Sequence, residues 1–198
     1  MVELLNQTLF LLINADVQPN ALIVMLAKLM ADLPIWLVPS LLVIGWLRGD
    51  NSIRKGFLAA ALTAVIALSV NQIISFFWQH PRPFMIGLGH TLIPHVADSS
   101  FPSDHMTLIC AVAFSLLWHP ALRKLGSMLL CLSLPVAWAR IYLGVHFPLD
   151  MIGAMLVTAL CAWLTQYQQK LLIEPAFKIV SSLYEWVFSP AIQRGWLK

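Results

Sequence analysis

The feature that most constrains this chain is a set of five long apolar runs separated by short polar segments. They cover residues 21–47, 56–79, 104–118, 122–139 and 148–166. An α-helix of about 20 apolar residues crosses the roughly 30 Å hydrocarbon core of a bilayer. Only 11% of the 198 residues are charged, whereas a soluble domain has about 25%. We therefore predict an all-α, multi-span transmembrane helix bundle that forms one membrane-embedded domain over residues 1–198.

The third run and the two ends of the chain are expected to differ from simple spanning helices. The third run has 15 residues, so its helix should begin below the membrane surface, at the floor of a pocket. Residues 2–13 predict a short interfacial helix. Residues 174–188 carry an apolar face that suits a helix on the membrane surface, and an ordinary packed C-terminal helix fits the pattern equally well.

The basic residues are distributed unequally between the two sides of this five-span bundle. Nine of the twelve Lys and Arg fall on one side, which the positive-inside rule makes cytoplasmic. These nine are Arg48, Arg54, Lys55, Arg123, Lys124, Lys170, Lys178, Arg194 and Lys198. Arg82 and Arg140 fall on the opposite side, and Lys28 lies inside the first span, where we expect it to pair with Asp32. The net charge of +3 is too small to indicate a nucleic-acid partner.

Three short polar stretches lie at the ends of spans on the side opposite the basic residues. They are residues 80–83 (HPRP), 102–105 (PSDH) and 140–150 (RIYLGVHFPLD). They are far apart in the sequence, but the five-span topology brings them to one surface of the bundle. We therefore predict that they form one site.

The residue types in these stretches suit the binding of phosphate. Arg82 and Arg140 are planar cations that can hold phosphate oxygens with paired hydrogen bonds. Ser103 is expected to be the N-cap of the helix that follows it. The backbone N–H groups of Asp104 and His105 would then point outward and form an anion site at the helix N-terminus.

Two histidines and a carboxylate complete the chemistry of phosphoryl transfer. Asp150 follows His146 by four residues, a spacing that lets the carboxylate hold one ring nitrogen while the other attacks phosphorus. His105 can protonate the departing oxygen and later activate water. A metal site formed by the same three residues is the competing interpretation, but the two nearby arginines would repel a divalent cation. The sequence thus predicts transfer through a phosphohistidine, with no cofactor and no metal.

These stretches resemble the three-part signature of the type 2 phosphatidic acid phosphatase superfamily of membrane lipid phosphatases. That signature runs lysine, six residues, Arg-Pro; then Pro-Ser-Gly-His; then Ser-Arg, five residues, His, three residues, Asp. The matching residues are Arg82, Pro83, Pro102, Ser103, His105, Arg140, His146 and Asp150, and the resemblance covers residues 56–166. It implies a helical bundle, a histidine nucleophile, no required metal, and a lipid-linked phosphate or diphosphate as substrate.

Three positions differ from that signature. Ser75 replaces its lysine, Asp104 its middle glycine and Ala139 the serine before the second arginine. With Asp in its middle motif, the chain resembles the bacitracin-resistance-type undecaprenyl-diphosphate phosphatases of bacteria. Asp104 is a substrate-binding candidate that can cap its helix, share a proton with His105 or repel extra negative charge. Lys28 is a candidate for the missing cation.

The resemblance implies hydrolysis of undecaprenyl diphosphate, recycling the lipid carrier for peptidoglycan synthesis on the periplasmic face of the bacterial inner membrane. A phosphatase of phosphatidylglycerophosphate or phosphatidate, or a lipid phosphotransferase, would carry the same motifs. A catalytically silent lipid-binding membrane protein is the alternative from another class. The outer loop also holds His80, His90, His95 and Asp98, and its histidines are expected to be solvated. The sequence does not predict an oligomeric state.

Overall fold

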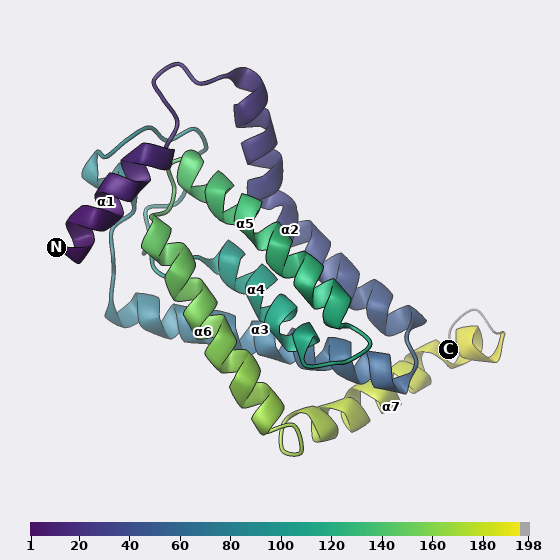
Figure 1. Cartoon of the computed structure of the whole chain (residues 1–198). Coiled ribbons are helices and arrows are strands. Elements are labelled where there is room, and N and C mark those ends of the chain that lie inside the picture. The colour runs from purple at the N-terminus through teal and green to yellow at the C-terminus, as the bar shows by residue number, and fades with distance from the viewer. Residues whose placement is uncertain (195–198) are drawn as a thin grey trace.

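The computed structural model describes residues 1–194 as a set of α-helices with one short 3-10 helix (Figure 1). The elements are α1 (Val2–Ile13), α2 (Ala21–Arg48), α3 (Asn51–Phe77), η1 (Pro83–Ile86), α4 (Asp104–Leu117), α5 (Arg123–Tyr142), α6 (Pro148–Tyr167) and α7 (Ile173–Gln193). No strand occurs within residues 1–194. The predicted all-α class is therefore confirmed. Lys198, one of the nine basic residues on the predicted cytoplasmic side, lies outside the described residues.

Four of the five predicted spans are long helices that surround the remaining one. Helices α2, α3, α5 and α6 are long and apolar enough to cross a membrane. Helix α4 has 14 residues, which is about 21 Å of helix, so it is shorter than the hydrocarbon core. It lies in the middle of the bundle and packs against α2, α3, α5 and α6 (Figure 1). The third predicted span is thus a short central helix.

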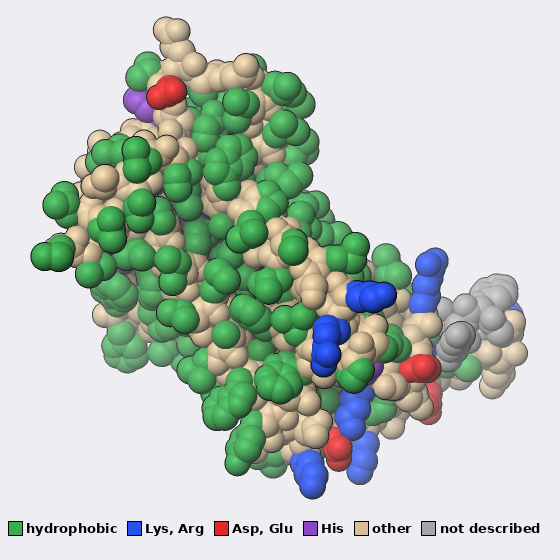
Figure 2. All heavy atoms as spheres, in the orientation of Figure 1, with side chains coloured by type: hydrophobic (Ala, Val, Ile, Leu, Met, Phe, Trp, Pro, Cys, Tyr) green, Lys and Arg blue, Asp and Glu red, His purple; other side chains and the backbone are tan. Residues whose placement is uncertain are grey.

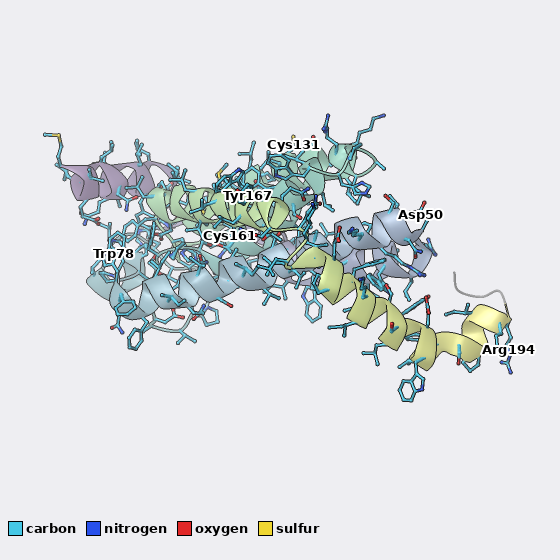
Figure 3. All side chains as sticks on the ribbon, turned by 90° about the horizontal axis from the view of Figure 1, so that it is seen from below. Asp50, Trp78, Cys131, Cys161, Tyr167 and Arg194 are labelled. Atoms are coloured by element: carbon cyan, nitrogen blue, oxygen red, sulfur yellow. The ribbon has the colours of Figure 1, made fainter. Side chains whose placement is uncertain are left out.

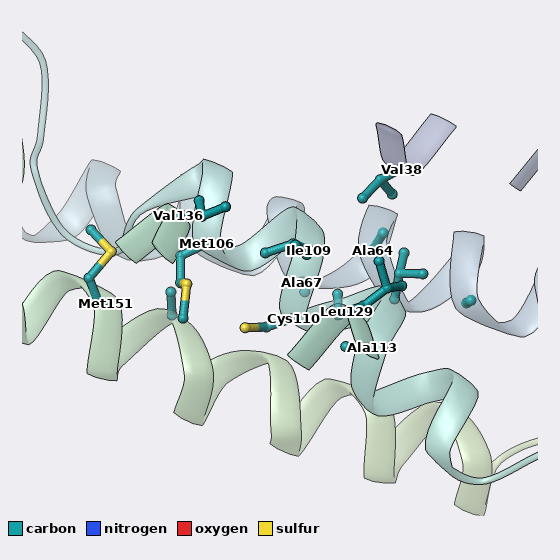
Figure 4. Packing of buried hydrophobic residues seen from close by; sticks show 14 of the residues in the cluster. Val38, Ala64, Ala67, Met106, Ile109, Cys110, Ala113, Leu129, Val136 and Met151 are labelled. Carbon is teal, nitrogen blue, oxygen red and sulfur yellow. The ribbon is translucent and has the colours of Figure 1, made fainter. Parts of the chain in front are cut away.

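The centre of the apolar core is built from α4. Its Met106, Ile109 and Cys110 are buried between the neighbouring helices (Figure 4). Ala64 and Ala67 of α3 face this cluster, and such small residues let two helices approach closely. Many large apolar side chains are exposed, and apolar side chains cover much of the visible face of the molecule (Figure 2). An apolar exterior around an apolar core is what a bundle needs when lipid surrounds it.

Helix α3 begins at Asn51, earlier than the predicted start of the second span at residue 56. The Asp50 side chain caps its N-terminus, as Asp does at many helix starts. Arg54, in the second turn, donates from Nε to the carbonyl oxygen of Trp46 (2.9 Å) and stacks over the ring of Tyr184 (4.5 Å). The hydropathy pattern predicted that the helix begins after Arg54, because a charged residue interrupts the apolar run. The contacts of Arg54 with Trp46 and Tyr184 allow the helix to begin earlier and to include it.

Helix α7 extends past one end of the bundle, with Arg194 at its far end (Figure 3). Phe177 and Tyr184 each pack edge-on against Trp46 of α2, with ring centroids 6.0 Å apart. Tyr184 is buried, while Ile179 and Trp186 are exposed. Of the two interpretations of this segment, the structure supports a packed C-terminal helix, and that helix also presents exposed apolar side chains.

Candidate active site

The three predicted motifs converge at one end of the bundle. The outer loop (residues 78–103, between α3 and α4) joins the N-terminus of α4, the C-terminus of α5 and the N-terminus of α6 around a cavity of about 260 Å³. We call this the reaction cavity. Five predicted site residues line it, namely Arg82, Asp104, His105, Arg140 and His146, while Ser103 and Asp150 lie outside its lining.

A tight turn between α5 and α6 carries His146. Gly144 has a φ of +80°, a left-handed conformation that favours glycine. A Cβ at this position would lie 2.1 Å from the carbonyl oxygen of His90, so the turn packs directly against the outer loop. The N–H of Val145 donates to the carbonyl of Arg140 (3.2 Å). The backbone therefore fixes His146 relative to Arg140.

One ring nitrogen of His146 is held by two neighbours. Its Nδ1 lies 2.9 Å from the carbonyl oxygen of Ser100 and 3.3 Å from Oδ2 of Asp150. The same Oδ2 accepts hydrogen bonds from the Ser100 hydroxyl and from the Phe147 N–H (2.7 Å). The predicted contact between His146 and Asp150 is present, but the backbone carbonyl is nearer. Asp150 also holds the segment that supplies this carbonyl.

The imidazole of His146 is in an environment that favours its neutral form. Burial lowers its pKa well below the ordinary value, and the positive charges of Arg140 and Arg82 lower it further. Because Nδ1 faces a carbonyl acceptor, Nδ1 carries the ring proton and Nε2 keeps its lone pair. This is the protonation state that a nitrogen nucleophile requires.

Arg82 is buried and makes hydrogen bonds to two loop residues and to the turn. Its Nε pairs with Oδ1 of Asp98 (2.8 Å), and its two terminal nitrogens donate to the carbonyls of Val145 (2.8 Å) and Ser99 (3.1 Å). One terminal nitrogen also lies 3.1 Å from Nε2 of His146. The guanidinium therefore flanks the position that a phosphorus atom would occupy when Nε2 attacks it.

Arg140 is buried between two histidines. Its terminal nitrogens lie 3.5 Å from Nε2 of His105 and 3.1 Å from Nε2 of His95. We expected the histidines of the outer loop to be solvated, and this expectation is wrong for His80 and His95, which are both half-buried; His95 also lines the reaction cavity. Burial lowers the pKa of His95, so its ring is neutral and can accept a hydrogen bond from Arg140.

The N-terminus of α4 points its unpaired backbone amides toward this site. Ser103 occupies the predicted N-cap position, but its hydroxyl makes no capping bond. The first intrahelical bond runs from the Thr107 N–H to the Ser103 carbonyl (2.9 Å), so the amides of residues 104–106 precede the hydrogen-bond ladder. The Ser103 hydroxyl is buried with no partner among the described residues. Both features suit an anion at this helix end.

Asp104 joins α4 to α3. Its carboxylate accepts hydrogen bonds from the amide groups of Asn71 (2.9 Å) and Gln72 (3.2 Å). It makes no capping bond to its own helix. Ser75, at the position of the family lysine, also lines the reaction cavity and donates its hydroxyl to the Phe101 carbonyl (3.1 Å). Asp104 and Ser75 therefore add no positive charge to the lining of the reaction cavity, whereas Arg82 and Arg140 add two.

The charged pair on α2 lies outside the reaction cavity. Lys28 and Asp32 line a separate cavity, and among residues 1–194 no ion pair joins them. Both side chains are exposed, so burial does not force them together. The expected ion pair is therefore absent, and Lys28 does not occupy the place of the family lysine.

Helix α1 is docked on the site, a role that its sequence did not indicate. The Asn6 side chain accepts a hydrogen bond from the N–H of Leu149 in the first turn of α6 (3.0 Å). Phe10 is buried against Phe147, with ring centroids 5.3 Å apart. Asn14 hydrogen-bonds to the backbone of the outer loop and of the end of α5. The helix thus clamps the loop and the turn that carry the site residues, while leucines on its outer face are exposed.

Most residues that sequence reasoning missed belong to the outer loop. Ser100, Asp98 and His95 hold or flank the predicted residues, but this loop has no periodic pattern that would assign a direction to each side chain. One signal was available on α3. Asn71 and Gln72 are adjacent polar residues in an apolar run, and polar residues within a membrane usually face the bundle interior.

The fold and the site together define a multi-pass membrane protein that handles phosphate. A neutral, buried histidine faces a cavity between two arginines, beside a helix N-terminus. Within residues 1–194 no group of three or more His, Cys, Asp or Glu is arranged to hold a metal ion. Similarity to known proteins identifies the family within this class.

The chain belongs to the PAP2 superfamily, whose model matches residues 56–173. It is 35% identical to YbjG of Escherichia coli (strain K12), provisionally named an undecaprenyl-diphosphatase, over 100% of both chains. It is also 35% identical to the undecaprenyl-diphosphatase BcrC of Bacillus subtilis (strain 168), over 73% of each chain.

Two solved structures have the same fold. LpxE of Aquifex aeolicus is 27% identical with a TM-score of 0.65, covering 82% of this chain and 95% of its own. A transmembrane PAP2-type phosphatidylglycerolphosphate phosphatase of Bacillus subtilis is 20% identical with a TM-score of 0.65, covering 86% of this chain and 87% of its own. The recognised signature and the predicted helical bundle are therefore confirmed, and the chain is a membrane phosphatase of this superfamily.

Proposed function

We propose that this protein hydrolyses undecaprenyl diphosphate to undecaprenyl phosphate and inorganic phosphate at the outer face of the bacterial inner membrane. The observation that carries the proposal is the neutral His146, whose Nε2 lies 3.1 Å from Arg82 at the wall of the reaction cavity. The names of YbjG and BcrC support the choice of substrate.

In the first step the terminal phosphate binds between the two arginines and the amides at the start of α4. Nε2 of His146 attacks phosphorus, and the bond from phosphorus to the bridging oxygen breaks. His105 takes up a proton from solvent when the negatively charged diphosphate binds, and it gives this proton to the departing oxygen. Undecaprenyl phosphate leaves, and His146 holds the transferred phosphoryl group. Asp150 and the Ser100 carbonyl keep the ring oriented and stabilise the positive charge that develops on it.

In the second step His105 accepts a proton from water as the water oxygen attacks phosphorus. The phosphorus–nitrogen bond breaks, inorganic phosphate is released, and His146 returns to its neutral form. In each step negative charge shifts among the oxygens of the transferred phosphoryl group, which lies between Arg82 and Arg140. Fixed cations at this position stabilise the transition state.

The distribution of charge supports an outward-facing site. On the visible face of the molecule, the Lys and Arg side chains gather at the end near α7, away from α1 and the reaction cavity (Figures 1 and 2). The positive-inside rule assigns that basic end to the cytoplasm. The reaction cavity then opens on the periplasmic side.

Two measurements test the proposal. We expect wild-type protein to form an acid-labile radiolabelled phosphoenzyme from labelled undecaprenyl diphosphate, and His146→Ala to form none. Phosphate release from a panel of lipid phosphates, run with a chelator, should be fastest with undecaprenyl diphosphate and insensitive to the chelator. Release from phosphatidylglycerophosphate alone would contradict the substrate, and absence of any phosphoenzyme or turnover would favour a lipid-binding protein.

A further inference from the structure

A second cavity adjoins the reaction cavity and has no role in the steps above. It has a volume of about 580 Å³ and lies between the C-terminal end of α3 and residues 97–99 of the outer loop. Gln72, Ser75, Asp98 and Ser99 line both cavities. The two cavities are therefore adjacent, and two linked groups of one molecule can each occupy one of them.

The donors in the two cavities differ in charge. Two arginines line the reaction cavity, whereas no Lys or Arg among the described residues lines the second one. Its neutral polar groups are the amides of Gln72 and Gln79, the imidazole of His80 and two serine hydroxyls. Its one carboxylate among the described residues, Asp98, is paired with Arg82 (2.8 Å). The second cavity therefore suits a group with less negative charge than the one held between the arginines.

Hydrogen-bonding groups in the second cavity are left for a ligand. The exposed amide of Gln79 makes no hydrogen bond within residues 1–194, and one amide N–H of the exposed Gln72 remains after its bond to Asp104, so both are accessible to a ligand. His80 is held from one side by Glu3 of α1 (3.3 Å), while its Nδ1 is buried without a partner in the described part of the chain. A buried polar atom without a partner is unfavourable unless a ligand or water pairs with it.

The second cavity also leads to the lipid-facing surface. Phe76 lines it and is 75% exposed, and the adjacent Phe77 is 81% exposed. Exposed aromatic side chains at the end of a spanning helix lie at the boundary between hydrocarbon and headgroups. A prenyl chain that emerges here would remain in the bilayer.

We propose that the second cavity binds the inner, non-transferred phosphate of a prenyl diphosphate, with Gln72 and Gln79 as hydrogen-bond donors. This inference rests on the proposed function. The inner phosphate carries less negative charge than the terminal one, so neutral amides suffice to hold it. When the bond to the bridging oxygen breaks, this phosphate becomes the headgroup of the released monophosphate. Gln79 is thus a specificity-determining residue that favours diphosphates over monophosphates.

The test compares two substrates with the same tail, farnesyl diphosphate and farnesyl monophosphate, in detergent. We expect Gln79→Leu to lower the ratio of kcat/KM for the diphosphate to kcat/KM for the monophosphate by about tenfold, the effect of losing one hydrogen bond to a charged group. Gln79→Glu, which keeps the size but adds a negative charge, should lower the ratio further. Gln168→Leu is the matched control. It replaces an exposed glutamine at the C-terminal end of α6, far from both cavities, and should leave the ratio unchanged.

The outcomes separate this inference from the proposed function. A wild-type ratio in both Gln79 variants, or an equal loss on both substrates, would overturn the inference while leaving diphosphate hydrolysis intact. Wild-type protein that hydrolyses only the monophosphate would overturn the proposed function, and this inference with it. Misfolding lowers activity on both substrates alike and so leaves the ratio unchanged; thermal unfolding of each variant, measured in the same detergent, shows whether the variant is folded.

Discussion

The carbonyl oxygen of Ser100 lies 2.9 Å from Nδ1 of His146, nearer than the carboxylate of Asp150 at 3.3 Å. Asp150 in turn accepts the Ser100 hydroxyl. The three residues therefore act as one unit, in which the carboxylate orients the histidine directly and also through the loop residue. Ser100 and Asp150 lie 50 positions apart in the sequence, so this unit exists only in the folded protein.

We expect substitutions in this unit to be non-additive. Asp150→Asn should lower kcat by on the order of 10²–10⁴-fold, because an amide favours the wrong ring tautomer of His146. Ser100→Ala keeps the carbonyl and should lower kcat by about tenfold through the loss of one hydrogen bond to a charged group. The double variant should fall no further than Asp150→Asn alone. If steady-state kinetics showed that the two losses of kcat multiply in the double variant, the three residues would not act as one unit.

The neutral His146 predicts a pH dependence of stability. Its pKa in the folded protein is lowered, whereas in the unfolded chain it is about 6.5. Below that pH the unfolded state binds the additional proton, so the free energy of unfolding falls as the pH falls, by up to about 1.4 kcal/mol per pH unit. Above that pH the histidine contributes no pH dependence.

Thermal unfolding in detergent between about pH 7.5 and pH 5.5 measures this effect. We expect His146→Gln to lose less stability on acidification than wild type, because it removes one such histidine. His90→Gln, which replaces an exposed histidine of the outer loop, should retain the wild-type slope. Equal slopes in all three proteins would mean that the pKa of His146 is not lowered in the folded state.

The parts of this protein that could be predicted from the sequence depend on local patterns. Hydropathy located α2, α5 and α6, and fixed spacing within single motifs identified Arg140, His146 and Asp150. Contacts between distant segments carry no such pattern. Asn6 reaches Leu149 across 143 positions, and Asn71 reaches Asp104 across 33. A polar residue in an apolar segment indicates that a partner exists, but the packing of the helices decides which one.

The docking of α1 predicts that a helix outside the family signature affects turnover. Asn6→Ala should destabilise the protein by about 1 kcal/mol, because it leaves the Leu149 N–H at the start of α6 unpaired. It should also lower kcat several-fold with little change in KM, since the turn that carries His146 loses a support. Asn6→Asp keeps the acceptor and should restore activity. Thr8→Ala, on the exposed side of α1, should have no effect on kcat.

The position of Ser75 predicts how the site would respond to the lysine that the family signature has at this position. Ser75 lines the reaction cavity beside Gln72 and Asp104, so a lysine there would extend toward a bound phosphate. We expect Ser75→Lys to lower the inhibition constant of inorganic phosphate about threefold to tenfold. This effect is smaller than that of a fully buried hydrogen bond to a charged group. Increasing salt should weaken the gain in phosphate affinity.

Ser75→Met fills similar space without a charge, so it separates electrostatics from shape. If both substitutions changed phosphate inhibition equally, the missing cation would not be what distinguishes this cavity. If only Ser75→Lys strengthened inhibition, tighter retention of the product would follow, and turnover limited by phosphate release should slow. A neutral wall at Ser75 would then favour rapid release of phosphate over tight binding, which is the choice expected of an enzyme that must return its carrier lipid quickly.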